Sequence, residues 1–100
     1  MRRFIVAAQG MSVDAEKQLK DYFQENGLGW WHWIENVWLI TSNRDDINAT
    51  DIHDKIDKSP VNVRVLVIEI DRSKDWTGYG PSTENNNMFE WLRTSWTAGN

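Results

Sequence analysis

The sequence contains no cysteine among its 100 residues. This absence excludes disulfides, thiolate zinc sites and cysteine nucleophiles. Long apolar runs are also missing, and Met1-Arg2-Arg3 is followed by only a short apolar run before Gln9-Gly10. That run is too short for a secretion signal, and no later run approaches the length of a membrane span. We therefore expect a cytoplasmic protein with no membrane segment.

Basic residues are outnumbered by acidic ones, 11 against 15, which gives a formal net charge of −4. A mildly acidic chain does not attract nucleic acid through its overall field, so we expect no nucleic-acid partner. Gly78-Tyr79-Gly80-Pro81 is not a phosphate-binding loop, because no Gly-Lys-Ser/Thr follows it. No nucleophile elbow or histidine–acid arrangement is present either. We expect no cofactor, no metal and no catalytic residue.

Tryptophan is abundant instead: the chain has seven, and Trp30-Trp31-His32-Trp33 is followed closely by Trp38. This region lies within a series of segments whose apolar spacing predicts regular structure. The segments are a strand at 2–8, a helix between the N-cap Ser12 and Gly27, a hairpin over 29–42 that turns at Glu35-Asn36, a helix from Asp46 or Asn48 to Ser59-Pro60, and a strand at 61–70.

The predicted order is strand, helix, strand, strand, helix, strand. With right-handed crossovers this order gives an α+β fold, a ferredoxin-like βαββαβ sandwich with two helices on one face of a four-stranded antiparallel sheet. Residues 1–76 form this predicted domain, and residues 77–100 form a loop and a short C-terminal amphipathic helix. That helix places Met88, Trp91 and Leu92 on one face, to pack on the same or a partner subunit.

Both faces of the predicted sheet carry apolar side chains. A two-residue turn pairs Trp33 with Trp38 and Trp31 with Ile40 on the helix-covered face, and leaves Trp30 and His32 on the other. A sheet that is apolar on both faces is usually covered on both. The cover is either the C-terminal helix or a second subunit, and we predict a homodimer or higher oligomer.

The aromatic residues have two interpretations: core and subunit interface, or an aromatic-lined pocket that stacks a planar ligand. In the second interpretation the loop at 71–87 closes over the pocket as a flap. Arg2, Arg3 and Arg64 either converge on neighbouring strands as an anion site or are ordinary charges at strand ends. The predicted ligand-binding residues are Gln9, Trp30, His32, Arg64, Trp76 and Tyr79.

The segments 29–40 and 63–70, with the acidic helix between them, resemble small bacterial and phage SinR-like proteins. These are relatives of the CRISPR-associated adaptation nucleases and of VapD ribonucleases. The resemblance implies a ferredoxin-like protomer that dimerises through its sheet, with the C-terminal segment crossing to the partner. Nuclease-type relatives carry a metal-binding aspartate at the end of the first strand. Here Val6-Ala7-Ala8-Gln9 occupies that region, without a carboxylate.

The favoured function is therefore a non-enzymatic, homo-oligomeric binding module. Its ligand is a small nucleotide-type or other planar anionic molecule, or else it binds a protein partner. In a phage, such a module would suit the sequestration of a host nucleotide signal. The alternative is a ribonuclease related to the resembled families, with His32 as its base.

Overall fold

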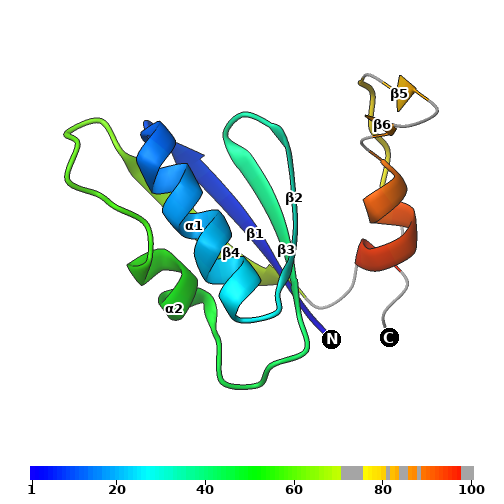
Figure 1. The fold of residues 1–100 in the computed structure, drawn as a ribbon, viewed down its shortest axis with the longest axis horizontal. Coiled ribbons are helices and arrows are strands. Elements are labelled where there is room, and N and C mark those ends of the chain that lie inside the picture. The colour runs from blue at the N-terminus through cyan, green and yellow to red at the C-terminus, as the bar shows by residue number, and fades with distance from the viewer. Residues whose placement is uncertain (71–75, 81, 84–85, 88, 98–100) are drawn as a thin grey trace.

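The computed structural model describes residues 1–70, 76–80, 82–83, 86–87 and 89–97. Its centre is an antiparallel sheet in the order β2-β3-β1-β4, and two helices lie on one side of it (Figure 1). The predicted α+β fold with a four-stranded antiparallel sheet is thus confirmed. The elements are β1 (Arg2–Gln9), α1 (Val13–Glu25), β2 (Gly29–Ile34), β3 (Val37–Ser42), α2 (Ala49–Asp54) and β4 (Arg64–Ile70).

Both helices begin where side-chain caps predict. The Ser12 hydroxyl accepts a hydrogen bond from the Ala15 amide at 3.0 Å, and Asn48 forms a reciprocal capping box with Asp51. The second helix ends at Asp54, well before the predicted Ser59-Pro60. The Lys58 ammonium donates to the carbonyl of His53 in the last turn and to that of Ile56 just beyond the helix.

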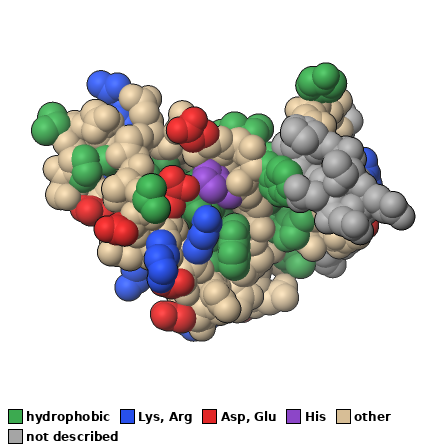
Figure 2. All heavy atoms as spheres, turned by 45° about the horizontal axis from the view of Figure 1, so that its top comes forward, with side chains coloured by type: hydrophobic (Ala, Val, Ile, Leu, Met, Phe, Trp, Pro, Cys, Tyr) green, Lys and Arg blue, Asp and Glu red, His purple; other side chains and the backbone are tan. Residues whose placement is uncertain are grey.

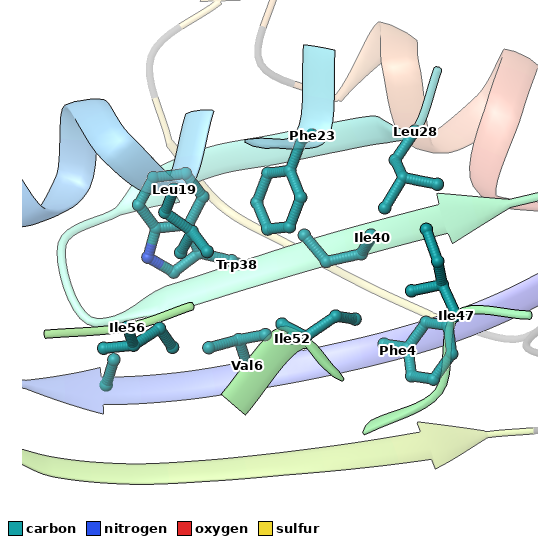
Figure 3. Close-up of a cluster of buried hydrophobic side chains, with 11 residues drawn as sticks. Phe4, Val6, Leu19, Phe23, Leu28, Trp38, Ile40, Ile47, Ile52 and Ile56 are labelled. Carbon is teal, nitrogen blue, oxygen red and sulfur yellow. The ribbon is translucent and has the colours of Figure 1, made fainter. Parts of the chain in front are cut away.

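The main core lies between the two helices and the sheet (Figure 3). Leu19 and Phe23 of α1 point toward Trp38 and Ile40 of β3, and all four are fully buried. Their spacing of four residues on the helix and two on the strand is what places each pair on one face. The other fully or nearly fully buried members are Phe4, Val6, Ala8, Leu28, Ile47, Ile52 and Ile56.

The register of the β2–β3 hairpin differs from the predicted one. The turn lies at Glu35-Asn36 as expected, and Ile34 pairs with Val37. A bulge then shifts the pairing, so that Trp31 lies opposite Leu39 and not Ile40. One extra residue in a strand exchanges its faces. The predicted faces of Trp30, Trp31 and His32 were therefore wrong, while Trp38 and Ile40 lie on the helix-covered face as predicted.

The bulge places the indoles as follows. Trp31 points away from the helices, while Trp30 packs on the helix side. Trp33 was expected to be buried against Trp38, but it is 42% exposed.

The C-terminal segment covers part of the opposite sheet face, within the same chain. It contains the two-residue strands β5 (Ser82–Thr83) and β6 (Asn86–Asn87) and a short π-helix, η1 (Leu92–Trp96). Leu92 and Trp96 of η1 are buried. The predicted C-terminal helix is present. Its buried contact with the sheet is made by Leu92 and Trp96, whereas the predicted face was Met88, Trp91 and Leu92. Met88 and residues 71–75, 81 and 84–85 of the predicted flap lie outside the described residues.

Two contacts hold η1 against the sheet. The buried Arg3 guanidinium of β1 donates through Nε to the Trp96 carbonyl at 2.6 Å. The Trp91 indole lies over Gly29, where a Cβ would be 3.5 Å from the indole and 2.5 Å from the Thr41 hydroxyl. A larger residue at Gly29 would therefore displace its neighbours. Within the described residues, no helix has the length and apolar character needed to cross a membrane.

Candidate ligand-binding site

The sheet face turned away from α1 and α2, here called the outer face, is built from cross-strand rows. The antiparallel register aligns side chains that share this face, one from each strand. The rows are Ile70, Arg3, Thr41 and Gly29; then Ile68, Ile5, Leu39 and Trp31; then Leu66, Ala7, Val37 and Ile34; and finally Arg64 and Gln9.

A cavity of about 290 Å³ lies between the outer face and the C-terminal part of the chain. The sheet forms its floor, and residues 76–79 with Phe89 and η1 form its walls. In Figure 2, apolar side chains gather on the surface that adjoins the C-terminal segment. The lining residues are Ile5, Trp31, Ile34, Val37, Leu39, Ile70, Trp76, Thr77, Gly78, Tyr79, Phe89, Leu92 and Trp96.

Close packing fixes the wall opposite the sheet. The rings of Trp76 and Phe89 lie 5.9 Å apart at a tilted angle. Gly78 approaches the same phenyl ring so closely that a Cβ would lie 2.5 Å from it. Glycine at this position lets the backbone of residues 76–79 settle on Phe89 and close one side of the cavity.

The chemistry of the cavity is apolar and aromatic. Of its described lining residues none is charged, and Thr77 and Tyr79 supply the polar side chains. Apolar cavities of this kind bury ligands through area and ring contacts, while a few polar groups orient them. The arrangement suits a planar, largely apolar ligand.

The six predicted site residues do not meet in one place. Trp76 and Tyr79 border the cavity as expected, although Tyr79 itself is fully exposed. Gln9 and Arg64 are cross-strand neighbours in the last row of the outer face, where they line a separate hollow of about 250 Å³. The remaining two, in β2, lie on the helix side.

Trp30 and His32 are part of the packing between α1 and the hairpin. The Trp30 ring lies 6.1 Å from that of Phe23. Nδ1 of His32 lies 2.9 Å from the Val37 carbonyl, and Nε2 lies 3.0 Å from Oε1 of Glu16. Both partners are hydrogen-bond acceptors, so the imidazole is oriented by β3 and α1 and not by a ligand.

The three arginines named as an anion site do not converge. Arg2 forms a two-bond pair with Glu69, at 2.9 and 3.0 Å, and this contact lowers the pKa of the Glu69 carboxyl. Arg3 lies under η1, and Arg64 lies at the other end of the sheet. Of the two interpretations, the positions favour an ordinary strand-end charge for Arg2, whereas Arg3 is buried and fits neither.

Several cavity residues were missed by the sequence analysis, above all Trp31, Phe89 and Trp96. Trp31 was assigned to the other face because the bulge has no marker in the sequence. A signal did exist for the C-terminal wall, since Phe89, Leu92 and Trp96 follow the spacing i, i+3, i+7 of one helix face.

Metal ligation has no support in the described part of the chain, where no three His, Asp or Glu side chains form a group that could hold an ion. The cavity therefore has to be interpreted from its own lining. Comparison of the chain with protein-family models, with curated proteins and with solved structures gave no significant match.

Proposed function

We propose that this chain is a non-enzymatic binding module that holds a planar, largely apolar ligand in the cavity of the outer face. The observation that carries the proposal is a 290 Å³ space walled by aromatic side chains from both the sheet and the C-terminal segment. A space-filling core would leave no such volume between Trp31 and Trp76. A ligand that fills it removes apolar area from water on two sides.

The alternative, a ribonuclease with His32 as its base, has less support. Both ring nitrogens of His32 lie within hydrogen-bond distance of acceptors, the Val37 carbonyl and the Glu16 carboxylate. The side chain is only 11% exposed, so with both nitrogens turned toward protein atoms the ring presents neither of them to a substrate. His32 is accordingly assigned to packing.

A ferredoxin-like fold and a relationship to the SinR-like proteins are part of the same proposal. The strand order β2-β3-β1-β4 with two helices on one face supports the fold. Oligomerisation is proposed as well, supported by apolar side chains that remain exposed on the outer face. The C-terminal segment folds over its own sheet, which reduces the area that a second subunit has to cover.

The test is calorimetric titration with uncharged planar probes, indole and 2-naphthol, combined with the shift in melting temperature. We expect saturable binding and a rise in melting temperature for the wild type. Trp76→Ala removes one ring of the wall and should weaken binding about 2- to 13-fold, the range for an aromatic pair of about 0.5–1.5 kcal/mol. A decrease of this size is expected from the loss of one ring contact in a protein that remains folded.

Trp33→Ala is the matched control, because it removes the same residue type from an exposed position that does not line the cavity. It should bind both probes like the wild type. The proposal fails if neither probe binds at millimolar concentration. It also fails if Trp76→Ala binds the probes as tightly as the wild type and the Trp33→Ala control do.

A further inference from the structure

The cavity continues along the outer face as an apolar strip that the C-terminal segment leaves uncovered. The strip comprises Leu66, Ala7, Val37 and Ile34, which form one complete cross-strand row, together with Ile68. Two of these residues, Val37 and Ile34, also line the cavity. The strip is therefore continuous with the cavity floor.

The strip is open to solvent in spite of its composition. Leu66 is 57% exposed, Ile34 51% and Ile68 46%. Ala7 is exposed as well, and its small side chain borders a trough that is lined by Gln9 and by Leu66 of β4. Contiguous exposed apolar surface of this kind marks a binding site more often than a solvent-facing one.

Among the described residues, one cation, Arg64, lies where the strip ends. Arg64 lies directly across from Gln9, one row beyond Leu66 and Ala7, and these four residues line the second hollow with Val65. Within the described residues, the Arg64 guanidinium has neither a hydrogen-bond nor an ion-pair partner. The Gln9 amide beside it offers a further donor for an oxyanion.

The spacing sets the size of a ligand that uses both places. Ile5 lies in the cavity floor, and Gln9 lies four residues further along the same strand. At about 3.3 Å per residue this separation is roughly 13 Å. An extended aliphatic chain of about ten carbons covers such a distance.

We propose that the ligand of this site is an amphipathic oxyanion, with its planar apolar end in the cavity, an aliphatic chain along the strip and its anionic group at Arg64. The inference rests on the proposed function, since it names the class of molecule that the cavity takes. One cation at one end of an apolar path matches a molecule with one charged end. A carboxylate and a phosphate monoester share this chemistry.

The experiment compares decanoate, decyl phosphate and the uncharged decanol by calorimetry, on wild type, Arg64→Gln and Lys17→Gln. In the wild type, both anions should bind about fivefold more tightly than decanol, the upper range for an exposed ion pair, and the preference should fall with salt. Arg64→Gln should abolish the preference. Lys17→Gln, which removes an exposed cation from α1, should preserve it.

Chain length and a blocked trough test the path between the two ends. From octanoate to decanoate the affinity should rise about three- to fourfold for each methylene. Ala7→Glu places a carboxylate in the exposed trough and should weaken decanoate strongly. The same variant should bind indole like the wild type, which also shows that it is folded.

Each contrary result has a separate meaning. Equal binding of decanol and decanoate to the wild type overturns the amphipathic proposal and leaves the cavity proposal intact. Failure of the decyl ligands and of indole overturns both. If decanoate does not bind and Ile68→Glu dissociates a dimer, the strip is a subunit interface, and the proposal is wrong.

Discussion

The imidazole of His32 lies flat on the indole of Trp38, with ring centroids 3.6 Å apart and an interplanar angle of 7°. The contact occurs at the bulge in β2, where His32 also bonds to the Val37 carbonyl. Through its other nitrogen the ring reaches Glu16 of α1. One side chain thus joins the helix, the bulged strand and the buried Trp38.

Replacement of His32 by alanine is expected to lower the free energy of unfolding by about 2 kcal/mol, because the ring stack and the polar contacts of the ring nitrogens are lost. The measurement is urea denaturation followed by far-ultraviolet circular dichroism. The only other histidine, His53, supplies the control: its side chain is 44% exposed on α2, so His53→Ala should stay within about 0.5 kcal/mol of wild type. Equal effects of the two variants would contradict a structural role for the stack.

The bulge itself can be tested with two neighbouring tryptophans. Trp31 is 5% exposed and Trp33 is 42% exposed, whereas a regular hairpin would give both the same face. Trp31→Ala should destabilise the protein by about 3 kcal/mol through the loss of buried area. Trp33→Ala should lower stability by less than about 1 kcal/mol. If the two losses in denaturation experiments are similar, the bulged register is incorrect.

The elements of the fold could be predicted from local signals. Ser12, Gly27 and Asn48 bound the helices through caps and a positive backbone φ, and these signals depend on adjacent residues alone. The hairpin register could not be predicted in the same way. The bulge is stabilised by contacts of His32 with α1 and β3, which lie outside the strand that bulges.

The candidate site was predictable only in part, because the positions of its residues depend on contacts between elements and not only on adjacent residues. Trp76 and Tyr79 do border the cavity, although it is not the pocket with Trp30 and His32 that was predicted. Arg64 and Gln9 were grouped with them, but a cross-strand register decides how far apart such residues lie. The cavity floor depends on which face Trp31 occupies, and the bulge determines that face.

Stability should depend on pH through the pair of Arg2 and Glu69. Folding lowers the pKa of the Glu69 carboxyl, mainly because Arg2 donates two hydrogen bonds to it. The contribution is therefore fully present above the ordinary glutamate pKa of about 4.3 and is lost as the pH falls through the lower value of the folded state. For a partly exposed pair it should not exceed about 1 kcal/mol.

Glu69→Gln measures this contribution. The difference in unfolding free energy between wild type and variant should be present at pH 7 and disappear near pH 3. Glu25→Gln, at an exposed position at the end of α1, should show no comparable change between the two pH values. A constant Glu69→Gln difference over this range would show that the ion pair does not stabilise the fold.

The remaining prediction is self-association of the protein. The surface expected to form the interface is the part of the outer face that the C-terminal segment does not cover. A symmetric pair that buries Ile68 and Leu66 should elute with a mass of about 23 kDa by light scattering, twice the chain mass of 11.7 kDa. Ile68→Glu should shift the mass toward one chain, because a carboxylate would be buried in an apolar contact. Val61→Glu changes a fully exposed valine in the loop before β4 and should leave the dimer intact.

Because a ligand at Arg64 would occupy the same strip, decanoate should also favour the single chain. A wild type that is monomeric at micromolar concentration would mean that the C-terminal segment covers enough of the outer face by itself.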